Sequence, residues 1–164
     1  MRRYISILVA LLFSIVIRAN FSQISQITTT EGLSSQNVRI MEKDKYGRLW
    51  VGSSIGLDIF NNGTLTNLQT IQVDSTSILT GQIKTIACGE RTLIGGKSTI
   101  IDYDYDTKKA EIIQYEGENI TTEHIIMNDS CAYFYDNTKN ILFKYMMATR
   151  DLQVITQFPE EKSY

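Results

Sequence analysis

Short apolar runs separated by glycine, asparagine and aspartate recur along this chain of 164 residues. Within Asp44–Phe60, the run Leu49–Val51 is followed by a glycine, and a second run, Leu57–Phe60, begins directly after another. Both runs are too short for a helix, and each contains an aromatic residue, which strands favour. The pattern predicts two antiparallel strands joined by a tight turn.

The same pattern continues to the end of the chain and predicts three groups of four strands. The predicted strands are Val38–Glu42, Leu49–Gly52, Leu57–Phe60 and Thr66–Ile71; Ile83–Cys88, Thr92–Gly95, Thr99–Tyr103 and Ala110–Gln114; and Glu123–Asn128, Ala132–Tyr135, Ile141–Tyr145 and Leu152–Thr156. Turn residues lie between them, as in Asp44–Gly47 and Asn61–Gly63, because glycine and asparagine accept the positive φ of tight hairpins.

The three groups are copies of one repeat. Tyr103–Ile113 aligns without a gap on Tyr145–Ile155, at an offset of 42 residues, and Phe60 lies 43 residues before Tyr103. Four antiparallel strands that repeat about every 40–45 residues are typical of β-propeller blades. We therefore expect an all-β chain that forms a partial β-propeller of about three four-stranded antiparallel blades. The blades are expected at about residues 33–75, 78–117 and 120–158.

The N-terminus has the pattern of a signal peptide. Arg2 and Arg3 precede an apolar stretch of 14 residues, Tyr4–Ile17, and small residues follow it. This pattern predicts a signal peptide over residues 1–22, cut after Ala19 or Ser22, and an exported region over 23–164. An uncleaved membrane anchor is the alternative, although a spanning helix needs about 20 apolar residues.

Composition and charge narrow the function. Apolar residues make up 43% of the chain, which excludes a disordered protein. Loss of residues 1–22 removes three arginines and takes the net charge from −2 to −5. An acidic domain is a poor candidate for nucleic-acid binding, so we expect no nucleic-acid partner. Cys88 and Cys131 are either a disulfide, which export permits, or two small buried side chains.

The run Gly32–Phe60 closely resembles the two-component regulator propeller repeat. The matching positions are Gly32-Leu33-Ser34, Val38, Asp44, Gly47, Leu49-Trp50-Val51-Gly52, Gly56-Leu57 and Phe60. The second group is degenerate, with Ile94-Gly95 in place of Val51-Gly52, and the third keeps little beyond alternation. The resemblance implies the N-terminal part of a Bacteroidetes-type hybrid two-component sensor histidine kinase. It also implies an oligosaccharide as the ligand.

Three blades leave two open faces, since closed propellers have about 4–8 blades. We therefore expect the chain to be a fragment that needs the missing sensor and kinase parts, or to self-associate, with two chains forming six blades. Either way the chain is expected to have no catalytic activity of its own. A propeller enzyme is a third hypothesis, but Arg39, Lys84 and His124, on the three first strands, show no repeated catalytic pattern.

Other motifs are incomplete. Asp102, Asp104 and Asp106 have calcium-loop spacing, but the loop lacks its glycine and its final glutamate. Gly95–Ser98 resembles the end of a phosphate loop whose first glycine is missing, and is better interpreted as a turn. We assign no catalytic residue, no metal ligand and no cofactor.

Five aromatic residues are candidate contacts for a sugar ligand. They either stack on sugars or pack between blades, and burial tendencies favour packing. These residues are Tyr103, Tyr105, Tyr133, Phe134 and Tyr135.

Overall fold

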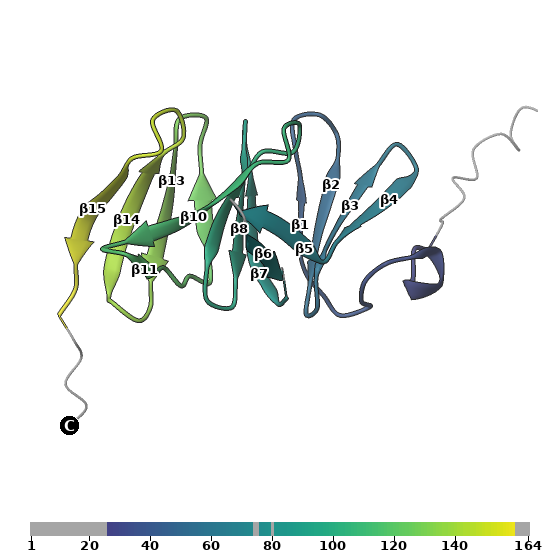
Figure 1. Cartoon of the computed structure of the whole chain (residues 1–164), viewed down its shortest axis with the longest axis horizontal. Coiled ribbons are helices and arrows are strands. Elements are labelled where there is room, and N and C mark those ends of the chain that lie inside the picture. Colours follow the sequence, from purple (N-terminus) through teal and green to yellow (C-terminus); the bar gives the residue numbers. More distant parts are fainter. Residues whose placement is uncertain (1–25, 74–75, 80, 160–164) are drawn as a thin grey trace, which may run out of the picture.

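The computed structural model describes residues 26–73, 76–79 and 81–159, so the predicted signal peptide lies outside the described residues. Within the described residues the chain forms fifteen strands and one short 3-10 helix, η1 (Thr29–Glu31). Three mainly antiparallel sheets follow one another in chain order (Figure 1). The predicted fold class, an all-β partial propeller with three four-stranded blades, is confirmed.

Each blade runs from an inner strand to an outer strand. Blade 1 is β1 (Val38–Lys43), β2 (Leu49–Ser53), β3 (Leu57–Asn61) and β4 (Thr64–Leu68); blade 2 is β7 (Ile83–Cys88), β8 (Thr92–Gly96), β9 (Ile100–Tyr103) and β10 (Ala110–Tyr115); blade 3 is β12 (Ile125–Met127), β13 (Cys131–Asp136), β14 (Ile141–Met146) and β15 (Leu152–Gln157). The inner strands contact one another, β1 with β7 and β7 with β12. The predicted turns are present, and Asn62 and Gly63 both have positive φ.

One predicted strand, Thr66–Ile71, is wrong. β4 ends at Leu68, and a separate strand, β5 (Thr70–Val73), forms a hairpin with β6 (Thr76–Leu79). β5 also pairs in parallel with β10, at Val73 and Ala110. Burial explains the break, because Ile71 and Val73 of β5 are buried between blades 1 and 2. A second addition was also not predicted: β11 (Glu118–Asn119) pairs with the end of β10.

The apolar cores lie between the blades. The first core joins blade 1, β5 and blade 2, and the second joins blades 2 and 3. The first contains Trp50, Leu57, Ile59, Ile71, Val73, Ile83, Ile86, Ile94, Ile101, Tyr103 and Ala110; the second contains Ala87, Leu93, Ile100, Ile113, Ile120, Ile125, Ala132, Phe134, Ile141, Phe143 and Tyr145. Successive residues of a strand point to opposite faces, so each blade 2 strand supplies both cores.

Asp44 organises the turn between β1 and β2. One carboxylate oxygen accepts hydrogen bonds from the backbone N–H groups of Tyr46 and Arg48, at 2.9 and 3.0 Å. The other accepts from Arg48 Nε at 2.5 Å and from the indole Nε1 of Trp50 at 2.9 Å. The Asp-x-x-Gly-x-Leu-Trp pattern thus describes one bonded unit, in which the acid holds the turn, and Gly47, with φ +84°, supplies its bend.

The residues that bond to Asp44 also contact blade 2. The Arg48 guanidinium lies over the ring of Tyr105, 3.8 Å from its centroid. The Trp50 ring makes edge contacts with Tyr103 and Tyr105, with centroids 6.1 and 5.9 Å apart. Edge-to-face and cation–π contacts of this kind stabilise the first core beyond the effect of the area that they bury.

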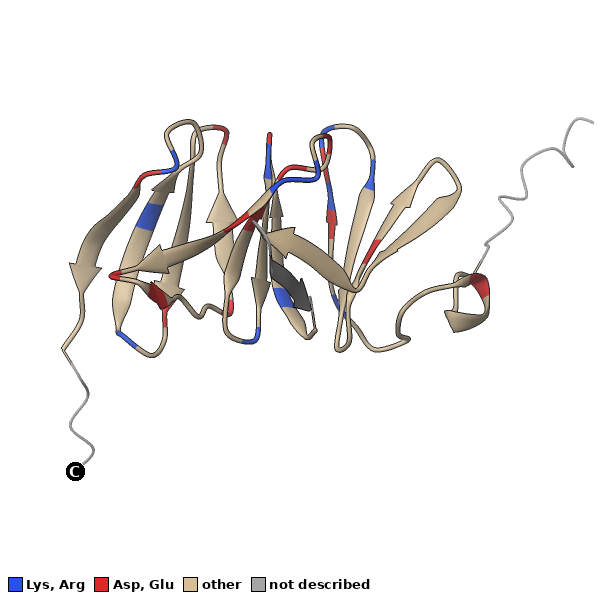
Figure 2. Cartoon of the chain, in the orientation of Figure 1, with Lys and Arg blue, Asp and Glu red and all other residues tan. Residues whose placement is uncertain are grey.

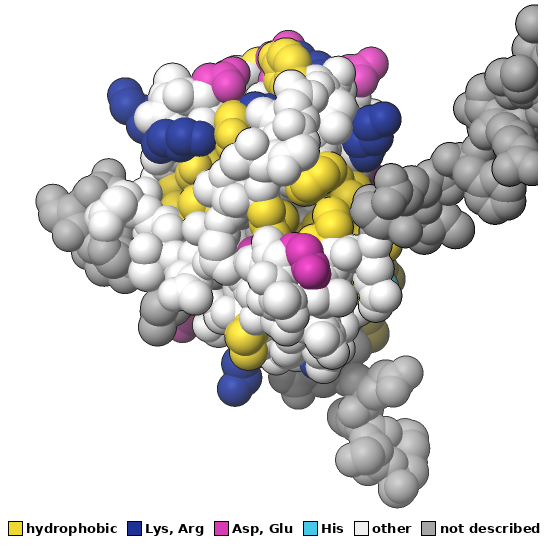
Figure 3. Space-filling model, turned by 90° about the vertical axis from the view of Figure 1, so that its right-hand side faces the viewer, with side chains coloured by type: hydrophobic (Ala, Val, Ile, Leu, Met, Phe, Trp, Pro, Cys, Tyr) yellow, Lys and Arg dark blue, Asp and Glu magenta, His cyan; other side chains and the backbone are white. Residues whose placement is uncertain are grey.

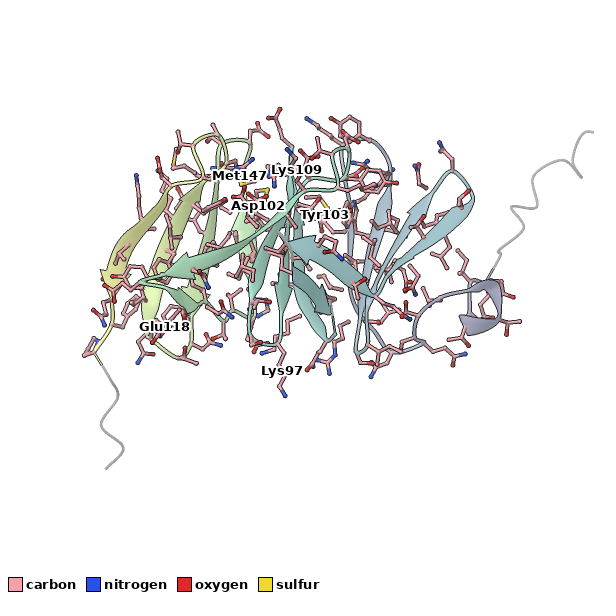
Figure 4. All side chains as sticks on the ribbon, viewed as in Figure 1. Lys97, Asp102, Tyr103, Lys109, Glu118 and Met147 are labelled. Carbon is pink, nitrogen blue, oxygen red and sulfur yellow. The ribbon has the colours of Figure 1, made fainter. Side chains whose placement is uncertain are left out.

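Blades 2 and 3 are joined by a buried carboxylate. Asp102, which is fully buried, accepts from Arg91 Nε at 2.5 Å and from the Tyr145 hydroxyl of blade 3 at 2.8 Å. Figure 4 labels Asp102 beside Tyr103 in the central blade. Burial and the neighbouring Asp102 charge raise the pKa of Tyr145, so the phenol stays protonated and donates.

Gly52 permits the inner strands to converge. A Cβ at this position would lie 2.5 Å from Ile83 Cγ2 of the next blade and 2.6 Å from Ile40 Cγ2. In blade 2, a Cβ at Gly95 would lie 2.5 Å from Thr85 Cγ2. Real Cβ atoms do not approach so closely, so glycine is needed at this point of blades 1 and 2.

Replacing Gly52 with alanine is expected to lower the free energy of unfolding by about 1–3 kcal/mol, the range for overpacked cores. Urea unfolding followed by Trp50 fluorescence measures the change. Gly96→Ala is the matched control, because an added Cβ there meets nothing closer than 3.7 Å. An equal loss in both variants would contradict the proposed role of Gly52.

Asp44→Asn is expected to lower the free energy of unfolding by about 1.5–3 kcal/mol, the range for hydrogen bonds to a charged group. Burial opposes ionisation of Asp44, but hydrogen bonds from Trp50 and Arg48 outweigh it and lower its pKa. The contribution is therefore present above about pH 4, the ordinary carboxyl pKa, and is lost as pH falls through the lower folded pKa. The stability gap between wild type and variant, measured by urea unfolding from pH 7 to pH 2.5, should narrow in acid; a gap independent of pH would contradict this account.

Candidate functional site

The candidate site lies where the inner strands begin, which we call the lower end of the array. Arg39 of β1, Lys84 of β7 and Glu123, just before β12, occupy this end together with Gln82. We call these four residues the mouth cluster. Figure 2 shows basic residues at the lower ends of β1 and β7.

Two β-bulges position the basic residues. In β1 the register shifts between Val38, which pairs with Ser53, and Ile40, which pairs with Gly52, so Arg39 is left over. In β7 the same shift between Ile83 and Thr85 leaves Lys84 over. A bulge redirects the extra residue away from regular alternation, so the repeat places two cationic side chains in equivalent positions.

Each basic residue bonds to a polar side chain further along the chain. With the Gln82 amide oxygen directed toward it, Arg39 donates from Nη1 and Nη2 to that oxygen, both at 2.8 Å. Lys84 forms an ion pair with Glu123 of blade 3. The Lys84 side chain is 21% exposed and that of Glu123 48%, so the pair is in contact with water. Because β1 and β7 contact each other, the two pairs lie at the same end of neighbouring inner strands.

This arrangement suits binding of a polar ligand by hydrogen bonds and ion pairs. Sequence reasoning named Arg39 and Lys84 but found no repeated pattern, because the bulge that makes them equivalent is a feature of strand pairing. It also named His124, which is exposed, where the structure places its neighbour Glu123 against Lys84. Sequence reasoning did not identify Gln82 and Glu123 as site residues. The signal that could have indicated them is a polar residue at the start of each first strand.

Of the three acids with calcium-loop spacing, Asp102 and Asp104 share Arg91 as a partner. Asp102 is bonded to Arg91 and Tyr145, as described above. Asp104 accepts from the backbone N–H groups of Asp106 and Thr107 at 3.0 Å, which is the role of a turn residue. Among the described residues, no three histidine, cysteine or acidic side chains gather as metal ligands do. The segment Gly95–Ser98 includes the turn between β8 and β9, where Gly96 N–H donates to the Thr99 carbonyl at 2.8 Å.

The predicted aromatic residues divide between packing and surface. Tyr103 and Phe134 are buried in the two cores, so these two are not exposed sugar platforms. Tyr105 packs on Arg48 and Trp50. Tyr133 and Tyr135 are half-buried and point away from blade 2, on the open face of blade 3.

A surface hollow of about 520 Å³ lies beside Tyr135 and is lined by Asn140, Phe158 and Pro159. The rings of Tyr135 and Phe158 meet edge to face at 5.8 Å, and the Tyr135 hydroxyl donates to Asn140 Oδ1 at 2.7 Å. Tyr135 occupies the row that Gly52 occupies in blade 1, a row that faces the following blade. The hollow therefore lies on the surface of blade 3 that corresponds to a blade-packing surface in blade 1.

The two cysteines are free thiols. Cys88 is half-buried, and burial raises the pKa of its thiol to about 12, so this thiol is unreactive at neutral pH. Cys131 is buried and lies 3.4 Å from both Asn128 Oδ1 and the Tyr133 hydroxyl oxygen.

The open face of blade 1 forms the N-terminal end of the row of three blades. Strand pairing places Met41, Val51 and Asp58 in one row of this face and Leu49, Phe60 and Leu65 in the next. Figure 3 looks toward this end and shows apolar side chains across its middle. The N-terminal segment crosses it, since Ser34 donates from its backbone N–H and its hydroxyl to the buried Asp58, at 3.0 and 2.6 Å.

These contacts account for the sequence pattern that begins at Gly32: a serine that binds Asp58, an aspartate that holds a turn, and a glycine that admits the next blade. The family described as two component regulator propeller matches residues 32–54. The resemblance that the sequence motif indicates is thus confirmed for these residues. Among curated proteins, none matches the sequence.

Solved structures show where such blades occur. The extracellular domain assigned to the hybrid two component system BT3049 of B. thetaiotaomicron superposes with a TM-score of 0.65 and 19% identity, over 79% of this chain and 19% of that one. The extracellular domain assigned to the one component system BT4673 of the same organism gives 0.56 and 18%, over 84% and 18%. This chain spans about a fifth of either structure, and the likeness establishes a shared propeller fold.

Among the residues that the structure describes, no helix combines the length and apolar character needed to cross a bilayer.

The Lys84–Glu123 ion pair is expected to have a coupling energy of about 0.5–1 kcal/mol, the upper range for surface pairs. A double-mutant cycle with Lys84→Ala and Glu123→Ala, measured by urea unfolding, gives this value. The matched control is Lys45–Glu90, at 3.4 Å with side chains 48% and 82% exposed, for which coupling near zero is expected. Equal coupling in the two pairs would show that burial of Lys84 contributes nothing.

Proposed function

We propose that this chain is part of the exported, periplasmic ligand-sensing propeller of a hybrid two-component sensor. The two-component regulator propeller repeat at residues 32–54 supports this function most directly. The fold that the chain shares with extracellular domains of such systems agrees with it. In this proposal the chain binds its ligand without chemical change, and a membrane segment and a kinase elsewhere in the intact sensor transmit the signal.

The mouth cluster is the proposed contact for the ligand. Three consecutive inner strands converge there, so a ligand at this point contacts more than one blade. Ligand contacts shared between blades couple binding to blade packing, which is how binding shifts a structural equilibrium. We propose an oligosaccharide as the ligand because the repeat resembles that of the two-component regulator propeller family.

The test is calorimetric titration of the full chain with a panel of neutral and acidic oligosaccharides, followed by mass spectrometry of the recovered sugar. We expect saturable binding and an unchanged sugar. Lys84→Ala should weaken binding, whereas Lys45→Ala, which removes a lysine paired across blades at the other end, should not.

Two results would overturn the proposal. Equal affinity of both lysine variants would exclude the mouth cluster as the contact. A cleaved or otherwise altered sugar would favour a propeller enzyme instead.

A further inference from the structure

The two bulges of the inner strands give two cationic residues the same place but different electrostatic partners. Lys84 is paired with the carboxylate of Glu123. Arg39 is exposed, and its hydrogen bonds go to the neutral amide of Gln82. Among the ion pairs of the described residues, Arg39 has none.

This contrast matters because every other described arginine has an acidic partner. Arg48 pairs with Asp44, Arg91 with Asp102, and Arg150 with Glu111. The chain as a whole is acidic, with a net charge of −2. The Arg39 guanidinium keeps its positive charge without an acidic partner, and the Gln82 amide holds its orientation without neutralising it.

The chemistry of the guanidinium identifies the complementary group. Gln82 occupies one N–H of each terminal nitrogen, which leaves Nε and the remaining N–H groups as donors. A planar set of donors matches the two oxygens of a carboxylate, which arginine binds in bidentate geometry. Lys84, two residues beyond Gln82 in the chain, adds a second positive charge nearby, partly balanced by Glu123.

We propose that Arg39 binds a carboxylate group of the sensed ligand, which makes the mouth cluster selective for an acidic ligand over its neutral counterpart. This inference rests on the proposed function and adds the chemical class of the ligand. Gln82 acts as a positioning residue that holds the guanidinium, and Lys84 contributes charge at longer range.

The experiment measures binding of trigalacturonate to the full chain by calorimetry, with fully methyl-esterified trigalacturonate as the neutral match. We expect binding of the acid and at least a tenfold weaker response to the ester. Arg39→Ala should weaken binding of the acid by about 10- to 100-fold, as expected for loss of charge-assisted hydrogen bonds. Raising the salt concentration should weaken it further.

Two variants separate binding from folding. Arg39→Gln keeps a hydrogen-bonding side chain without the charge and should lose affinity as Arg39→Ala does, with an unchanged melting temperature. Arg150→Ala is the control, because it removes an exposed arginine that pairs with Glu111 across blades 2 and 3 and should leave binding unchanged.

The outcomes distinguish this inference from the proposed function. Equal binding of acid and ester, or full binding by folded Arg39→Gln, would overturn the carboxylate contact but leave oligosaccharide sensing in place. Citrate binding as tightly as trigalacturonate would support the carboxylate contact and overturn the sugar ligand. Failure of the wild-type chain to bind either trigalacturonate or citrate would overturn the inference.

Discussion

Both apolar cores of the described chain lie between blades, and the rest of the structure depends on this constraint. A blade with two apolar faces, such as blade 2, cannot bury either face by itself, so each blade is stabilised by its neighbours. Blade 2 buries both of its faces, and most of its buried apolar side chains belong to one of the two cores. The residues that make the repeat recognisable, including Asp44 and Gly52, act at these same contacts.

Buried carboxylates give the apolar contacts their register. Apolar surfaces can slide over one another at little cost, whereas a buried carboxylate is tolerated only with its donors in place. Asp44 sets the turn that carries Arg48 and Trp50 toward blade 2, and Asp102 holds blade 3 through the Tyr145 hydroxyl. Asp58 does the same for the N-terminal segment through Ser34. Each acid therefore fixes one relationship between segments that are distant in sequence.

The sequence pattern predicted the strands of each blade but not the contacts that connect one blade to the next. Alternation and turn residues located eleven of the twelve predicted strands closely, because both are local properties. The prediction of one strand over Thr66–Ile71 failed because no typical turn residue stands at Gln69. The strand breaks there because Ile71 is buried against the next blade. The mouth cluster was only half visible, since a bulge is defined by the partner strand and leaves no trace in β1 or β7 alone.

Gly52 and β5 together shape the contact between blades 1 and 2. At the inner side, the missing side chain of Gly52 brings Ile83 of blade 2 close to blade 1. At the outer side, Ile71 and Val73 are inserted between the same two blades. A narrow inner gap and a filled outer gap give the pair of blades the form of a wedge. Residue size along this radius, small inside and large outside, therefore sets the angle between neighbouring blades, and an accumulated angle is what determines how many blades complete a ring.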